Sequence, residues 1–250
     1  MLMLILLPPS ESKSPGGTGP KIEVETLSLP QLNPIREHLM SALVELAQDE
    51  DACAKALKLG PRQSDDITAN AQLRQSPTMA AIDRYTGVLY DALDIASMKI
   101  SERGHAVERL AIGSALFGVV RADDQIPYYK FSATARIPGQ PTLRALWRTV
   151  LSQELEQLDV GIVIDLRSGG YAALGPVEGA VTATVVTERE DGSRKVVSHF
   201  NKHHKGLLAR ALSLSKLEPT DISDVASIAK RNGLHAEVSG ESELTIVTQP

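Results

Sequence analysis

The 250-residue sequence contains a single cysteine, Cys53, which lies in a stretch of helical character. One cysteine cannot form a disulfide within the chain, so the sequence is typical of a protein from a reducing compartment. We interpret Cys53 as a small apolar core residue, because no pocket of basic residues that would activate a thiol is evident around it.

Long hydrophobic runs are also lacking. No stretch approaches the roughly 18 apolar residues that a membrane-spanning helix needs. The apolar residues 1–7 carry no positive region and no small-residue cleavage site, and Pro8 and Pro9 end the run, so it is unlike a signal peptide. We therefore expect a cytoplasmic protein without a membrane partner.

The sequence has no excess of positive charge. Lysine and arginine number 26 against 31 aspartates and glutamates, which gives a formal net charge of −5. This excludes a chain that is basic all over, although a local basic face remains compatible with it. Apolar residues make up 42% and charged residues 23%, as in ordinary globular proteins, and 250 residues suffice for a sizeable core.

The hydrophobic pattern interleaves helices and strands. Strands are expected at 2–7, 160–166 and 243–248, and a hairpin is expected from 180–188 and 194–200. Helices are expected at 33–48, continuing as further helix to 59, and at 64–75, 77–93, 142–158 and 203–214, and another begins at about 220. For 107–120, strand and buried helix both fit. We find no repeat or linker, so the sequence predicts one domain over 1–250. Its expected class is mixed α/β (α+β), with a mixed sheet surrounded by helices.

Acidic residues are missing from two stretches, 125–153 and 193–217, although both contain several lysines and arginines. Two such runs in a chain of net negative charge indicate a basic face. The alternative is that acid-free runs of this length arise by chance.

Aromatic residues are few, and all nine lie between Tyr85 and Phe200. We expect Phe117, Trp147 and Phe200 in the core. Tyr128 and Tyr129 lie beside Lys130 in a polar stretch, and Arg84 precedes another tyrosine. Aromatic rings next to cations are used to stack nucleobases and pair with phosphates, but core packing explains the same pattern.

Residues 200–206 combine Lys202, His203 and Lys205 at the expected start of a helix. Backbone N–H groups at a helix start and these cations would form an anion site. A solvated basic helix start is the alternative, although positive charge there opposes the helix dipole. His199, His203 and His204 could suggest a metal site, but the pair with His-x3-His spacing has no obvious third ligand. We therefore expect no metal and no other cofactor.

Polar residues follow two of the expected strands. Asp165 and Arg167 come directly after 160–166, and Ser168 to Gly170 could form an anion-binding turn or a plain loop. Glu11 and Lys13 follow the first strand. Open α/β sheets place their ligands at such strand ends, and Glu11 and Asp165 are the candidates for an acid or base if the protein is an enzyme.

Several blocks in order resemble the peroxide stress protein YaaA family. They are residues 3–13, 81–93, 116–129, 146–147, 163–166, 170–171 and 199–206. The similarity is collinear from residue 2 to about 248. The chain departs from the family where Pro-Ala-Lys is replaced by Pro9-Ser-Glu-Ser-Lys13, where Arg-Pro-Asp becomes Arg121-Ala-Asp123, and where Asn-Leu-Ala-Ser becomes Asp165-Leu-Arg-Ser168.

This resemblance implies a single-domain cytoplasmic protein that limits hydrogen peroxide damage, partly by lowering reactive iron. It also implies DNA binding through a positively charged cleft and a helix-hairpin-helix element, for which 203–214 and 221–230 are the expected helices. In this hypothesis the DNA is bound without sequence specificity. The expected phosphate-binding and stacking residues are Lys13, Arg84, Tyr128, Tyr129, Lys130, Arg167, Lys202, His203 and Lys205. The alternative is an enzyme that acts on a bound nucleobase or nucleotide.

Overall fold

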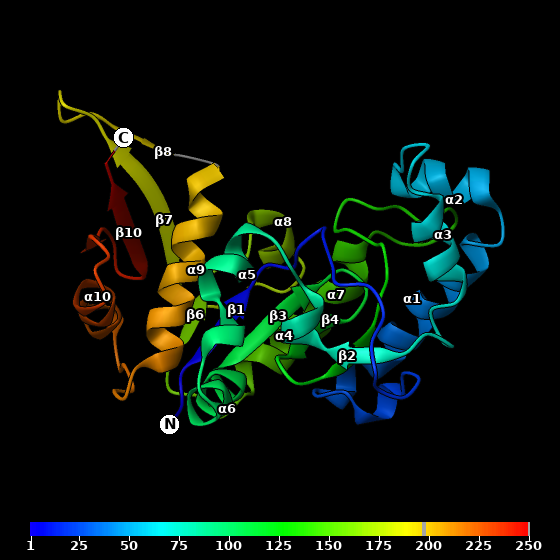
Figure 1. Cartoon of the computed structure of the whole chain (residues 1–250), viewed down its shortest axis with the longest axis horizontal. Coiled ribbons are helices and arrows are strands. Elements are labelled where there is room, and N and C mark those ends of the chain that lie inside the picture. The colour runs from blue at the N-terminus through cyan, green and yellow to red at the C-terminus, as the bar shows by residue number, and fades with distance from the viewer. Residues whose placement is uncertain (197–198, 250) are drawn as a thin grey trace.

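Most of the strands belong to one mixed sheet. The computed structural model describes residues 1–196 and 199–249, with only the backbone described at 199 and 200. The eight strands of the sheet have the order β4-β3-β1-β6-β7-β10-β9, and β8 pairs with β7 (Figure 1). The pairs β3–β1, β1–β6, β6–β7 and β7–β10 are parallel, whereas β4, β8 and β9 pair antiparallel with their neighbours. The expected mixed α/β fold is thus confirmed.

The strands of this sheet are β1 (Leu4–Leu7), β3 (Leu110–Ser114), β4 (Gly118–Arg121), β6 (Val163–Asp165), β7 (Val181–Glu188), β8 (Arg194–Val196), β9 (Ala236–Val238) and β10 (Glu243–Thr248), and a separate pair is formed by β2 (Thr78–Ala80) and β5 (Gln125–Pro127). The expected strands at both ends of the chain are confirmed, and so is the hairpin of β7 and β8. Its second strand is shorter than the expected 194–200, because residues 199 and 200 belong to a helix and residues 197–198 lie outside the described part of the chain.

The α-helices are α1 (Asn33–Leu46), α2 (Glu50–Leu57), α3 (Ser64–Ala71), α4 (Ala81–Arg84), α5 (Val88–Leu93), α6 (Ile100–Arg109), α7 (Leu143–Glu156), α8 (Gly169–Ala172), α9 (His199–Leu214) and α10 (Ile222–Arg231), with short 3-10 turns at Val24–Thr26, Pro30–Leu32 and Ile95–Ser97. Helix α9 packs against both α5 and β7. Figure 1 shows α10 at one end of the molecule and α1, α2 and α3 at the other. None of the described helices is long and apolar enough to cross a membrane.

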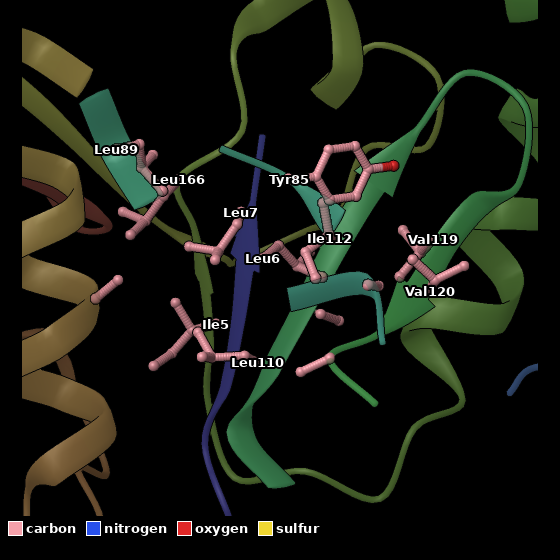
Figure 2. Close-up of a cluster of buried hydrophobic side chains, with 14 of the residues drawn as sticks. Ile5, Leu6, Leu7, Tyr85, Leu89, Leu110, Ile112, Val119, Val120 and Leu166 are labelled. Atoms are coloured by element: carbon pink, nitrogen blue, oxygen red, sulfur yellow. The ribbon is translucent and has the colours of Figure 1, made fainter. Parts of the chain in front are cut away.

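The core follows from uninterrupted apolar strands. All four residues of β1 and all five of β3 are buried, as expected for parallel strands that are covered on both faces. Figure 2 shows Ile5, Leu7 and Leu110 among the side chains packed around these strands. Phe117 and Trp147 are fully buried, as predicted, whereas Phe200 lies outside the described side chains.

Cys53 is buried in a small separate cluster with Ala47 and Ile67. Burial raises the pKa of its thiol, which keeps the sulfur in its less reactive protonated form. Its interpretation as a core residue is confirmed.

Two expectations for secondary structure need correction, and one open alternative is decided. The helix predicted over 77–93 is instead β2, α4 and α5, because residues 78–80 pair with β5 and Gly87 adopts a φ of 98° between the two helices. The ambiguous 107–120 is the end of α6 followed by the β3–β4 hairpin. Helix α9 begins at His199 rather than at residue 203, so the basic motif 200–206 lies inside its first turns.

Candidate functional site

The loops that follow β1 and β6 leave the sheet side by side. Leu6 of β1 pairs with Asp165 of β6, but the chain passes from β1 to β3 on one side and from β6 to β7 on the other. In open α/β sheets, ligands bind outside the carboxyl ends of the strands at such a divergence. We call the surface formed by residues 8–14 and 165–171 the strand-end edge.

Lys13 turns its amine toward two tyrosine rings at this edge. Its Nζ lies 4.5 Å from the centre of the Tyr129 ring and 5.4 Å from that of Tyr85, and it donates to the Ser10 carbonyl oxygen at 3.2 Å. Burial lowers the pKa of Lys13 to about 8, against an opposing effect of Glu11 and with a smaller lowering by Lys130. A desolvated ammonium is stabilised by any anion that reaches it.

A buried chain of hydroxyl groups lies beneath Lys13. The Tyr129 hydroxyl lies 2.7 Å from the hydroxyls of both Tyr85 and Ser114. Ser114 is the last residue of β3, and its Oγ accepts from the backbone N–H groups of Leu116 and Phe117. Burial raises the pKa of Tyr85 to about 12, so these hydroxyls keep their protons at neutral pH. These hydroxyl contacts hold the rings of Tyr85 and Tyr129 in place, and we call the two rings the lysine cage.

Tyr129 is 1% exposed, which corrects the expectation that it stacks on a base from the surface. Tyr128, its neighbour, is half-buried and donates to the Asp66 carboxylate at 2.8 Å. Tyr128 lines a cleft of about 560 Å³ together with Lys13, Asp66 and Gln72. Of the two tyrosines, Tyr128 is therefore the one that a ligand in this cleft would meet.

Glu11 and Lys130 form an ion pair across the same edge. The Lys130 Nζ lies 3.3 Å from Glu11 Oε2, and the Glu11 side chain is 60% exposed. Lys130 belongs to the acid-free stretch 125–153, so the structure brings that stretch next to the loop after β1. Glu11 stays open to solvent and to a ligand.

Arg84 is fully buried, which corrects its expected role as a direct phosphate contact. Its guanidinium donates to the carbonyl oxygens of Ser14 at 2.5 Å and Ile126 at 3.2 Å. Arg84 therefore fixes the loop after β1 against β5, and it affects the site by positioning that loop.

Asp165 and Arg167 bind each other. Arg167 donates from Nε to Asp165 Oδ1 at 2.9 Å and from Nη2 to Oδ2 at 2.7 Å, and Nη2 also donates to the Gly175 carbonyl oxygen. Both residues are buried. This corrects two expectations: Asp165 is held as the partner of an arginine rather than as a free acid or base, and Arg167 is inaccessible to a nucleic-acid backbone.

The basic motif of α9 faces the loop after β6. Lys205 donates from Nζ to the Leu166 carbonyl oxygen at 3.2 Å, and burial lowers its pKa. Lys202, one turn before Lys205, is exposed, and so is His203, which lies on a different side of the helix. The first turn of α9 contains no acidic residue. The second acid-free stretch thus supplies one exposed and one partly buried lysine on the side of α9 that faces the strand-end edge.

The amino end of α10 is occupied by its own side chains. Asp221 accepts from the Asp224 N–H, and Asp224 accepts from Thr220. Residues 220–222 lie with the amino ends of β6, β7 and β10, the opposite edge of the sheet from Lys13. The two helices expected for a helix-hairpin-helix element are present, but the carboxylates of Asp221 and Asp224 at this end repel a phosphate.

Three residues of the site escaped the sequence analysis: Ser114, Tyr85 and Asp66. The available signal for Ser114 was a polar residue at the end of an apolar strand. It could not be used, because the assignment of 107–120 as strand or helix was open. Among the described residues, no group of three or more histidines, cysteines, aspartates and glutamates is arranged to hold a metal ion.

Comparison with known proteins places this arrangement in a family. The family model described as peroxide stress protein YaaA matches residues 3–237. The chain belongs to this family. It is 47% identical over 251 residues to a UPF0246 protein of Corynebacterium efficiens, with 98% of this chain and all of that protein covered. It is 47% identical to a UPF0246 protein of Corynebacterium glutamicum, with 98% of each chain covered, and 38% identical to one of Streptomyces coelicolor, with 96% and 94% covered.

The departures of this YaaA-family chain can now be located. The longer segment Pro9-Ser-Glu-Ser-Lys13 still delivers its lysine to the strand-end edge, where the amine lies over Tyr129. In the third departure, Asp165 and Arg167 supply the buried ion pair described above. The resemblance inferred from ordered blocks is therefore confirmed at the level of the family.

Proposed function

We propose that this protein serves the peroxide stress response in the cytoplasm by binding DNA at the strand-end edge, without sequence specificity. Membership of the YaaA family supports the peroxide-stress role. Phosphates would pair with Lys202, His203 and Lys205 on one side of the edge and with Lys130 on the other. Such contacts supply most of the affinity in sequence-independent binding.

The observation that carries the proposal is the meeting of the two acid-free stretches. Lys130 of the first stretch pairs with Glu11 after β1, and Lys205 of the second contacts Leu166 after β6. β1 and β6 are hydrogen-bonded neighbours. Two basic runs that are distant in the sequence therefore end at one edge of the sheet.

The charges at this edge sum to a positive value. Around it the cations Lys13, Lys130, Arg167, Lys202 and Lys205 outnumber the carboxylates Glu11, Asp65, Asp66 and Asp165, and Arg167 and Asp165 neutralise each other. A local positive field in a chain of net charge −5 steers a polyanion to this edge. A phosphate bound there would also offset the unfavourable interaction between the basic first turn of α9 and the helix dipole.

Titration of the purified chain with fluorescently labelled single- and double-stranded DNA across a range of salt concentrations tests the proposal. We expect log K to fall linearly with log salt, and the double variant Lys202→Ala/His203→Ala to bind more weakly with a slope reduced by about 1. Lys216→Ala is the matched control. It removes an exposed lysine of the same acid-free stretch, two residues from Glu218, which binds the Met3 N–H at the opposite edge.

Unchanged binding by the Lys202→Ala/His203→Ala variant would contradict the proposed face, and absence of binding at low salt would contradict DNA binding itself. The limitation of iron damage is a further part of the proposal. It is supported by the resemblance, and the described residues add no metal-ligating group to that support.

A second candidate function is an enzyme that acts on a nucleotide. The observation that favours it is the Lys13 amine, held between two tyrosine rings at the mouth of a cleft with its pKa lowered toward neutrality by burial. Groups with such pKa values are typical of sites that transfer protons. Glu11 is the accessible carboxylate beside it, whereas Asp165 is committed to Arg167.

Incubation of the chain with nucleoside mono-, di- and triphosphates, with products analysed by mass spectrometry, tests this second function. We expect a product that is lost in Lys13→Met and in Glu11→Gln and that is retained in Lys216→Ala. Absence of a product with every nucleotide, together with salt-sensitive DNA binding, would leave DNA binding as the function of the edge.

A further inference from the structure

A second cavity lies away from Lys13, at the carboxyl ends of β7 and β10. It has a volume of about 770 Å³. Its walls come from the β7–β8 hairpin, from α9, from the segment after α10 and from the end of β10, which Figure 1 shows together at one end of the molecule. Cavities of this size hold small organic ligands.

The rim of this cavity is cationic. Arg189 and Lys195 of the hairpin line it together with His204 of α9 and His235 before β9, and none of the described residues that line it is a carboxylate. Within the described part of the chain, neither Arg189 nor Lys195 has a carboxylate within ion-pair distance. Charges left without counterions in a concave site attract an anion from solution.

The pleat of the sheet separates the cations from the nearest carboxylates. Thr187 pairs with Lys195, and both line the cavity, whereas Glu188 pairs with Arg194. Successive residues of a strand point to opposite faces, so Glu188 and Arg194 lie on the other face. There Arg194 holds Glu188 at 2.7 Å and Glu237 at 2.6 Å. Both carboxylates are therefore occupied, and neither neutralises the rim.

The floor of the cavity is apolar. Leu234 lines it with a small exposed part of its side chain, 7% of the residue, beside the fully buried Ile246. Gly233, with a φ of 81°, turns the chain at the end of α10 into the cavity wall. A phosphate group alone would leave this floor uncovered, and the backbone of a DNA duplex has no apolar group that reaches it.

We propose that this cavity is a binding site for a small organic anion that carries a flat apolar body, such as an aromatic sulfonate or a nucleoside monophosphate. The anionic group meets Arg189 and Lys195, and the apolar body covers Leu234. This site is independent of the DNA-binding face proposed above, because it uses neither Lys202 nor the residues of the strand-end edge.

Fluorescence titration of the full chain with 8-anilinonaphthalene-1-sulfonate tests this proposal. We expect one saturable site, and at least tenfold weaker binding by Arg189→Ala/Lys195→Ala, whose two exposed side chains contribute little to folding. Lys230→Ala is the control, because Lys230 is an exposed cation on α10 that does not line the cavity. Absence of saturable binding, or equal affinity in the double variant, overturns the proposal.

Displacement of the bound probe distinguishes the remaining ligands. We expect adenosine monophosphate to displace it at concentrations where inorganic phosphate does not. Equal displacement by inorganic phosphate would reduce the cavity to a bare anion site and overturn the role of the apolar floor. Displacement by a short DNA duplex in stoichiometric amounts would assign the cavity to the nucleic-acid face and overturn its independence.

Discussion

The amine of Lys13 lies 4.5 Å above the ring of Tyr129, on the side of the sheet where β1 and β6 diverge. The two residues come from the loops after β1 and after β5, more than 100 positions apart in the sequence. Because the ring is held by hydroxyl contacts to Tyr85 and Ser114, the amine meets a rigid aromatic surface in place of water. The burial of the amine at this surface lowers the pKa of Lys13, which affects both the charge of the site and the stability of the fold.

Stability should depend on pH through Lys13. The pKa of this lysine is about 8 in the folded chain, whereas it returns to about 10.5 on unfolding. Below pH 8 both states carry the proton and the fold bears the cost of a buried charge, and between pH 8 and 10.5 the folded state releases the proton and the cost falls. The stability of wild type relative to Lys13→Met should therefore increase by roughly 2 kcal/mol from pH 7 to pH 10.

Urea denaturation of both proteins at pH 7, 8, 9 and 10 measures this difference. Lys216→Met serves as the control, because an exposed lysine has a similar environment in both states. A gap between wild type and Lys13→Met that does not change with pH would show that the amine is not desolvated in the folded protein.

Substitution of Asp165 should destabilise the fold. Asp165→Asn leaves the buried Arg167 guanidinium without its counter-charge, and loss of one partner of a buried pair costs about 3–5 kcal/mol. Glu188→Gln breaks a pair whose side chains are both 41% exposed, and should cost no more than about 1 kcal/mol. Chemical denaturation of the two variants compares them, and similar losses would contradict a structural role for Asp165.

Removal of the Ser114 hydroxyl should loosen the lysine cage. Ser114→Ala takes away a partner of the buried Tyr129 hydroxyl and the acceptor of two backbone N–H groups, which should cost about 1–3 kcal/mol. Ser132→Ala, which removes an exposed hydroxyl bonded to Thr134, should stay within about 0.5 kcal/mol of wild type. Thermal unfolding of both variants measures the effect, and a Ser114→Ala variant as stable as the control would exclude a structural role for the chain.

Strands β1, β6, β7, β8 and β10 and the location of the candidate site could be predicted from the sequence because they depend on local patterns, whereas β2, β5 and β9 were not predicted. An uninterrupted apolar run identifies β1, and polar residues directly after β1 and β6 mark the carboxyl edge of the sheet. Lys13 was recognised as a site residue for this reason, whereas Lys130 was recognised as a cation beside two tyrosines in an acid-free stretch. The structure adds that they meet at the same edge as Lys205.

The fate of each side chain could not be predicted, because it depends on partners that are distant in the sequence. Arg84 is buried where it donates to the carbonyl oxygens of Ser14 and Ile126, which are 70 and 42 positions away. Tyr128 and Tyr129 are neighbours with the same composition around them, yet one bonds Asp66 at a cleft and the other Ser114 in the core. The missed strand β2 likewise exists only because β5 lies beside it.

The position of α9 depends on the absence of a side chain at Gly206. A Cβ at this position would overlap the Leu89 carbonyl oxygen and lie 2.7 Å from the Ala92 Cβ of α5. Gly206→Ala should therefore push α9 away from α5 and destabilise the fold by about 1–3 kcal/mol, although alanine is the better helix former. Gly104→Ala in α6, where no atom lies within 4 Å, should instead stabilise it by about 0.5–1 kcal/mol. Opposite shifts in melting temperature are the expected result.

Because α9 carries Lys202 and Lys205, Gly206→Ala should also weaken DNA binding at low salt, whereas Gly104→Ala should leave it unchanged. Equal stabilisation by both substitutions would show that α9 and α5 are not in close contact.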